Sequence, residues 1–182
     1  MMPRGTTNLP RRCGARVGGF TLIELIAVLV ILAAIAALVV PALTSISATR
    51  QREAASRLVR DLQLARQRSV AAGLRTWVVI DADADRYSLF IEDTASPGRA
   101  GRVPMIDDAT GRDFVVSLDR GEWRGAAIEA IDFGGGNEFA FDRRGRPLIG
   151  DDTPLTDDAT ISLSGGHIVR ITARTGQVQR MR

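Results

Sequence analysis

The chain has 182 residues, a formal net charge of +3, one histidine, one cysteine and no lysine. This length allows one domain plus an additional element. The single cysteine, Cys13, excludes an internal disulfide and any site built from several cysteines. Residues 1–19 hold four arginines and no acidic residue, so the remaining chain carries 20 arginines against 21 acidic residues, a net charge of −1. Most of the basic character therefore belongs to the N-terminal segment.

Residues 20–40 form an almost uninterrupted apolar segment in which only Thr21 and Glu24 are polar. As a helix these 21 residues would extend about 31 Å, which matches the hydrocarbon core of a bilayer. The arginines before this segment favour a cytoplasmic N-terminus, because an excess of Lys and Arg stays inside. The sequence thus predicts a single membrane-spanning helix with the remaining chain translocated.

Residues 1–48 allow three interpretations. A secretory signal peptide would explain the basic start, but an apolar segment of 21 residues exceeds the usual length of about 7–15. An uncleaved membrane anchor would explain that length, but neither Glu24 nor the glycines before it. The third interpretation rests on the motif "GGFTLIEL".

This motif resembles the class III signal of type IV pilins and pseudopilins. The resemblance implies that a prepilin peptidase cuts the basic leader between Gly19 and Phe20 and that Phe20 becomes N-methylated. Glu24 then occupies the position of the fifth mature residue. Thr21, Leu22, Ile23 and Leu25 also fit the pattern.

Glu24 is an expensive residue in a membrane helix, so it normally marks a partner or a function. A buried carboxylate recovers much of its desolvation cost beside a cation. We therefore expect Glu24 to pair with the N-terminal amine of a neighbouring subunit and to serve subunit assembly.

Residues 41–73 predict an amphipathic continuation of the helix. Pro41 would kink or end a helix, but helical periodicity resumes after it and lasts to about Ala72, with Gly73 as a stop signal. The predicted buried face comprises Ala54, Leu58, Leu62, Ala65 and Ser69. The other face is basic, and we expect it to be solvated, with lipid headgroups or an acidic neighbour as alternatives; it comprises Arg50, Arg57, Arg60, Arg66 and Arg68.

From Leu74 the pattern changes to the two-residue period of strands. About eight short strands are predicted over 75–81, 86–92, 113–118, 126–133, 138–142, 160–164, 167–173 and 177–181. Residues 94–111 predict a long surface loop. The expected fold is α+β and pilin-like: a long N-terminal helix, membrane-spanning in its first half, packed on an antiparallel β-sandwich over residues 74–182.

The last third of the chain resembles the domain shared by the H-type minor pseudopilins of type II secretion (GspH) and the FimT minor pilins. The quoted stretches are "FDRRGRPLIG" and "ISLSGGHIVRITARTGQV". The residues that match are Phe141, Gly145, Ile161, Leu163, Ile168, Ile171, Gly176 and Val178.

Few residues suggest chemistry. Asp81, Asp83 and Asp85 alternate as calcium ligands do, with Glu92 at position 12, but position 6 is Arg86 where a calcium loop needs glycine. We expect a hairpin turn there, with calcium as the alternative. The sole histidine, His167, has no second His or Cys to complete a zinc site or a catalytic triad. Three pairs of acidic residues are expected in solvated loops: Asp107/Asp108, Asp151/Asp152 and Asp157/Asp158.

The C-terminal segment from Ile161 contains no acidic residue. It carries Arg170, Arg174, Arg180 and Arg182, which are either a solvated strand edge or a contact for DNA phosphates. The resemblance to FimT minor pilins, some of which bind DNA through a basic C-terminal region, makes DNA uptake the alternative function.

The interpretation that we favour is a minor pseudopilin of a type II secretion system, neither an enzyme nor dependent on a cofactor. It implies a single-pass inner-membrane protein with a cytoplasmic N-terminus and a periplasmic domain. The implied partners are the prepilin peptidase, other pseudopilins or pilins, the inner membrane and an exported protein substrate, with DNA only in the alternative.

Overall fold

The computed structural model describes residues 21–149 and 152–181, without the side chains of residues 37–45. The chain divides into two units, Met1–Ala42 and Leu43–Arg182. Gly19 and Phe20, the predicted cleavage and methylation positions, lie outside the described residues, as do Asp151 and Arg182.

Helix α1 extends over Leu22–Ala72 as one continuous element through position 41. It begins after Thr21, whose side-chain Oγ1 accepts a hydrogen bond from the backbone N–H of Glu24 at 3.3 Å. It ends at Gly73, which adopts a φ of 65°, the left-handed conformation that closes a helix at little cost for glycine. The predicted helix end is confirmed.

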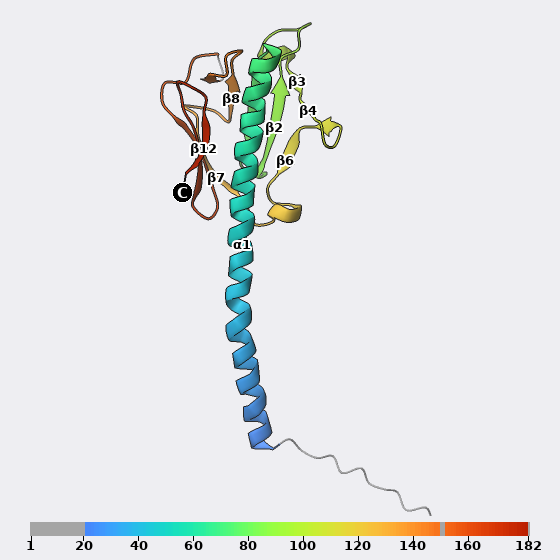
Figure 1. Ribbon diagram of the computed structural model, residues 1–182, viewed down its shortest axis with the longest axis vertical. Coiled ribbons are helices and arrows are strands. Elements are labelled where there is room, and N and C mark those ends of the chain that lie inside the picture. Colours follow the sequence, from blue (N-terminus) through green and yellow to red (C-terminus); the bar gives the residue numbers. More distant parts are fainter. Residues whose placement is uncertain (1–20, 150–151, 182) are drawn as a thin grey trace, which may run out of the picture. The chain divides into compact units, whose positions relative to one another are not determined.

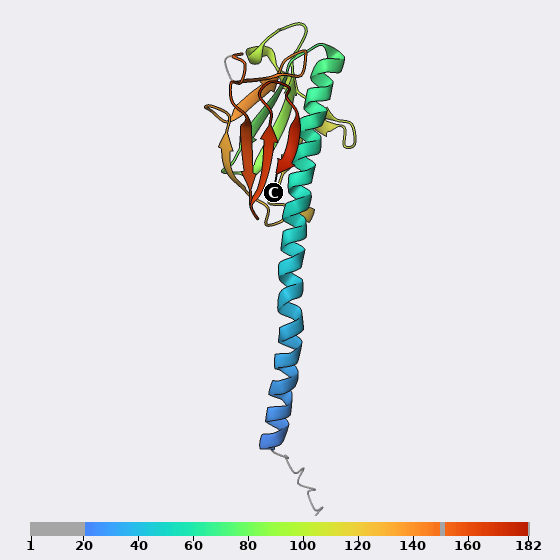
Figure 2. The same cartoon turned by 60° about the vertical axis from the view of Figure 1, so that its left-hand side comes forward.

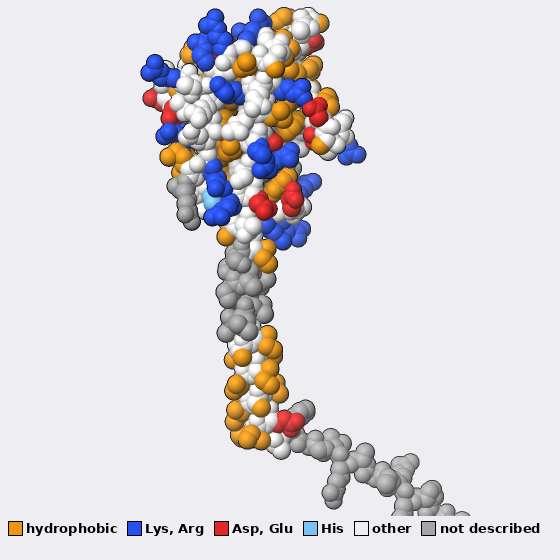
Figure 3. Space-filling view, viewed as in Figure 1, with side chains coloured by type: hydrophobic (Ala, Val, Ile, Leu, Met, Phe, Trp, Pro, Cys, Tyr) orange, Lys and Arg blue, Asp and Glu red, His pale blue; other side chains and the backbone are white. Residues whose placement is uncertain are grey.

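In the first unit, every side chain of residues 21–36 is exposed. Hydrophobic side chains cover the visible face of this part of α1 (Figure 3). No helix among the described residues is both long enough and apolar enough to span a bilayer. The predicted span 20–40 includes Phe20 and the undescribed side chains of residues 37–40, and it stays a prediction.

The second unit contains the rest of α1 and, among the described residues, three antiparallel sheets (Figures 1 and 2). The first sheet has the order β3-β2-β1-β8-β9, with β6 also paired to β2, and the second has the order β12-β11-β10-β7. The third pairs β4 with β5. The first sheet comprises β1 (Thr76–Asp81), β2 (Arg86–Ile91), β3 (Val103–Pro104), β6 (Val115–Ser117), β8 (Glu138–Phe141) and β9 (Pro147–Ile149). The others comprise β4 (Ile106–Asp107), β5 (Arg112–Asp113), β7 (Ile128–Asp132), β10 (Ala159–Leu163), β11 (His167–Ile171) and β12 (Val178–Met181).

One core joins α1 to both large sheets. The predicted helix face is confirmed, because all five of its residues have 0% exposure. Leu58 and Leu62 share a cluster with strand residues of both sheets, including Val78 of β1 and Val169 of β11. Since apolar burial is the main favourable term in folding, this cluster holds the second unit together. The predicted α+β fold is confirmed.

Two of the glycines that match the H-type domain, Gly145 and Gly176, lie in turns, and the structure shows why Gly176 is needed. Gly176 closes the β11–β12 turn with a φ of 66°. A Cβ at this position would lie 2.0 Å from the carbonyl oxygen of Gly145 in the β8–β9 turn. The same carbonyl accepts a hydrogen bond from Arg66 Nε of α1 at 3.0 Å. A side chain at Gly176 would therefore disturb the contact between two turns and the helix.

The prediction of a long surface loop over 94–111 is wrong in part, because the segment contains the short helix η1 (Arg99–Gly101) and the strands β3 and β4. Two buried carboxylates, those of Glu92 and Glu138, bind residues of this segment. Glu92 accepts hydrogen bonds from the backbone N–H groups of Arg75 and Gly98, and Glu138 pairs with Arg102 at 3.0 Å. Burial by itself would raise the pKa of Glu92, but the two backbone bonds together with the hydrogen bond and the charge of Arg143 lower it. These long-range contacts leave no pattern in the segment itself.

Candidate functional site: the N-terminal helix and its contacts

Glu24 lies in the first turn of α1 and is exposed. Thr21 and Glu24 occupy the first and last places of a capping box, in which a Thr and a Glu three residues later satisfy free N–H groups at the start of a helix. The bond from Glu24 N to Thr21 Oγ1 is one half of that arrangement. A carboxylate also suits the positive end of the helix dipole. Sequence reasoning missed this capping role, although the pattern T-x-x-E was visible.

In the second unit, Asp61 connects α1 to the first sheet. It is 5% exposed, and its Oδ2 accepts hydrogen bonds from Tyr87 Oη at 2.6 Å and from Arg57 Nε at 2.8 Å. The Arg57 guanidinium also lies 5.9 Å from the centroid of the Trp123 ring, within cation–π range. Asp61 lies three residues after Leu58 and four before Ala65, so the helical period could have placed it on the buried face.

Burial raises the pKa of Asp61, and the hydrogen bonds from Tyr87 and Arg57 oppose this without cancelling it. Burial likewise raises the pKa of the Tyr87 hydroxyl well above its usual range, and the charge of Asp61 adds to the effect. Tyr87 is therefore a neutral donor and Asp61 the acceptor at neutral pH. The three side chains fix the rotation of α1 against β2, because a buried polar group must keep its partner.

This geometry predicts a pH dependence of stability. A carboxyl with a raised folded-state pKa stabilises the fold below its ordinary pKa, and this contribution is lost as the pH rises through the folded-state pKa. The advantage of the wild type over Asp61→Asn should therefore shrink between about pH 3 and about pH 7. Urea unfolding of both proteins at the two pH values measures it.

Glu92 and Asp142 have lowered pKa values, so they make the fold more stable at higher pH, which is opposite to the effect of Asp61. Their contribution is the same in the wild type and in Asp61→Asn, so it cancels in the difference between the two unfolding free energies. Asp83→Asn, at an exposed aspartate, is the matched control and should show no such trend. An advantage that is constant or grows with pH would contradict the assignment.

The basic face of α1 is only in part the solvated flank that was predicted. Arg50, Arg60 and Arg68 are exposed as expected, although Arg68 also pairs with the exposed Asp108. Arg57 and Arg66 are partly buried, and they bind Asp61 and the Gly145 carbonyl. The prediction was wrong for these two residues because a helical face adjoining a sheet meets the loops of that sheet, which helix periodicity does not represent.

The three C-terminal arginines that the structure describes do not all lie on one face. Arg170 pairs with Asp158 at 3.4 Å, whereas Arg180 reaches Ser56 of α1 at 3.0 Å. Arg180 lies opposite the buried Val169, and neighbours along a strand point to opposite faces, so Arg170 and Arg180 point away from each other. Arg174 is exposed in the β11–β12 turn. DNA contact by these arginines stays a prediction.

The predicted hairpin at Asp81–Arg86 is confirmed. Asp81 accepts hydrogen bonds from Arg86 and from the backbone of Ala84, and Asp85 accepts one from the backbone of Ile128 at 2.7 Å. Within residues 21–149 and 152–181, no group of three or more His, Cys, Asp or Glu side chains is arranged to hold a metal ion. His167 begins strand β11 and is partly exposed.

Comparison with known proteins gives a match to the N-terminal motif and a separate match to the fold. Residues 14–40 match the family described as the prokaryotic N-terminal methylation motif. Two structures of the minor pseudopilin EpsH from the type II secretion system of Vibrio cholerae have similar folds. The first has a TM-score of 0.52 and 15% sequence identity, and the match covers 72% of this chain and 96% of EpsH. The second has a TM-score of 0.53 and 16% sequence identity, and the match covers 73% of this chain and 94% of EpsH.

The type IV minor pilin FimU of Pseudomonas aeruginosa matches with a TM-score of 0.46 and 17% identity over 74% of this chain and 90% of its own. No curated protein sequence matches the chain. The chain thus combines a prepilin-type methylation motif with a fold similar to that of a minor pseudopilin, as the sequence resemblance predicted.

Proposed function

We propose that this protein is a minor pseudopilin of a type II secretion system, assembled through its N-terminal helix into a periplasmic pseudopilus. The observation that carries the proposal is the coincidence of the methylation motif at residues 14–40 with the EpsH-like fold. Its role is mechanical and recognitive, with no catalytic step. It contacts other pseudopilins and the exported protein substrate.

In this proposal the prepilin peptidase cuts between Gly19 and Phe20 and Phe20 is N-methylated. The helix over residues 20–40 then lies in the inner membrane, with its N-terminus on the cytoplasmic side and residues 74–182 in the periplasm. The cut removes four arginines and Cys13, so the mature protein is nearly neutral and has no thiol.

Mass spectrometry of the mature N-terminus tests the processing step. In cells that contain a prepilin peptidase, the chain should begin with N-methylated Phe20, because the motif places the cut after Gly19. Cells without the peptidase are the control and should retain the leader. An intact segment 1–19 in both strains would reject the proposal.

A second measurement distinguishes a type II secretion system from a type IV pilus that takes up DNA. Deletion of the gene should abolish protein export and leave DNA uptake unchanged if the protein serves type II secretion. The reverse result would favour the alternative, a FimT-like minor pilin.

A further inference from the structure

The turn between β8 and β9 displays three arginines on a rigid support. Oδ1 of Asp142 accepts hydrogen bonds from the backbone N–H groups of Arg144 and Arg146, both at 2.8 Å, and Oδ2 accepts one from Arg146 Nε at 2.9 Å. Two backbone bonds close the same turn, from Gly145 N to the Asp142 oxygen and from Asp142 N to the Arg146 oxygen. Because these hydrogen bonds fix the backbone conformation of the turn, the Cα atoms of the three arginines have defined positions.

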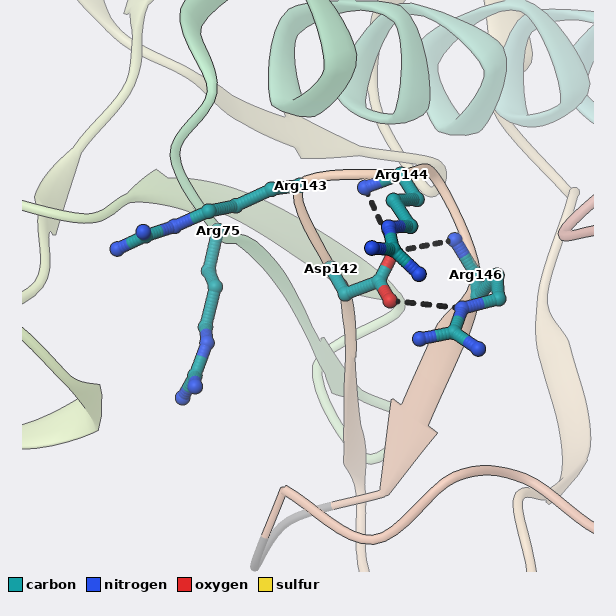
Figure 4. Close-up of a pocket in the computed structure, with 5 residues that line it drawn as sticks. All are labelled: Arg75, Asp142, Arg143, Arg144 and Arg146. Atoms are coloured by element: carbon teal, nitrogen blue, oxygen red, sulfur yellow. Dashed lines mark hydrogen bonds and ion pairs between the residues drawn. The ribbon is translucent and has the colours of Figure 1, made fainter.

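A fourth arginine reaches the turn from a distant part of the sequence. Arg75, between α1 and β1, lines a pocket of about 220 Å³ together with Asp142, Arg143, Arg144 and Arg146. Figure 4 shows Arg144 and Arg146 next to the Asp142 carboxylate, whereas the Arg143 side chain extends away from it on the side of Arg75. The pairing of β1 with β8 brings these two segments together.

The lining of this arginine pocket carries four cations and one anion. The carboxylate of Asp142 is engaged by the turn, and these bonds outweigh burial and lower its pKa. Arg143 pairs with Glu92 at 3.4 Å, and Arg75 pairs with Asp152. A guanidinium has five N–H donors, so one ion pair leaves capacity for further acceptors. Arg143 and Arg146 keep 63% and 53% of their side chains exposed.

We propose that the arginine pocket binds neighbouring carboxylates of an acidic peptide segment in a partner protein. Arginine forks bind carboxylates through paired hydrogen bonds, and the four arginines that line this pocket of about 220 Å³ offer such forks to more than one carboxylate. The proposal does not depend on the secretion function, because it rests on the geometry of residues 75 and 142–146 alone.

The pocket suits a peptide better than a nucleic acid. No aromatic side chain lines it, whereas single-stranded nucleic acid usually stacks its bases on aromatic rings. Its arginines surround a closed turn instead of following a stripe.

Fluorescence anisotropy with the purified full chain in nonionic detergent tests the proposal. The probe is a fluorescein-labelled peptide of alternating glycine and glutamate, and its counterpart carries glutamine instead of glutamate. We expect the glutamate peptide to bind at low salt and the glutamine peptide not to bind. Arg143→Gln with Arg144→Gln should weaken binding about tenfold, as expected for lost charge-assisted hydrogen bonds.

The matched control is Arg120→Gln with Arg124→Gln, which removes the same charge at two exposed arginines beside the short helix η2 (Gly121–Trp123). It should bind the peptide like the wild type, and thermal unfolding should show that both double variants are folded. Three results would overturn the proposal: no binding at low salt, equal losses in both double variants, or tighter binding of a single-stranded oligonucleotide through the same arginines.

Discussion

Glu24→Gln should be cleaved and methylated normally but should enter the filament at least about tenfold less than the wild type. We expect this defect because glutamine can still form a capping box but carries no charge to pair with the N-terminal amine of a neighbouring subunit. The measurement is the amount of protein in the sheared filament fraction relative to the membrane fraction, with cleavage followed by mass spectrometry.

This substitution separates the two roles that Glu24 can have. Glu24→Ala removes both the charge and the cap, so it should be at least as defective as Glu24→Gln. Glu53→Ala, at an exposed glutamate in the same helix, is the matched control and should assemble normally. If Glu24→Gln assembles like the wild type while Glu24→Ala does not, the residue serves the helix start and not subunit pairing.

Leu58→Ala should lower the free energy of unfolding of the second unit by about 2–5 kcal/mol. Leu58 has 0% exposure and lies in the cluster that joins α1 to both large sheets. Its truncation removes apolar burial and leaves a cavity that the surrounding strands cannot fully close. Urea unfolding of the full chain in detergent, followed by the fluorescence of the buried Trp77, measures the change.

Leu29→Ala makes the same chemical change in the same helix, at a leucine that is 57% exposed in the first unit. The unfolding of the second unit should then change by no more than about 0.5 kcal/mol. Equal losses in the two variants would mean that Leu58 does not hold the helix to the sheets.

The elements of this fold were largely predictable because local periodicity encodes them. The buried face of residues 54–69, the helix end at Gly73 and the hairpin after Asp81 follow from patterns within a few residues. Strand β9 was missed because it has only three residues and begins with Pro147, and a proline weakens the sequence signal of a strand. The structure places it at the edge of the first sheet, where a proline in the first position is tolerated. The short elements in 94–111 were missed because Glu92 and Glu138 hold them from outside the segment.

The sequence by itself determined the processing motif, the position of Glu24 and the α+β class, because each depends on residues close together in the chain. Only the tertiary structure decided which charged residues face one another. It placed Asp61 within hydrogen-bond distance of Tyr87 and Arg57, engaged Arg57 and Arg66 of the expected basic face, and brought Arg75 to the turn at 142–146. Apart from Arg57 and Asp61, which are four residues apart on the helix, these pairings join residues that are tens of positions apart. Their energies depend on burial and distance, which exist only once the strands have paired.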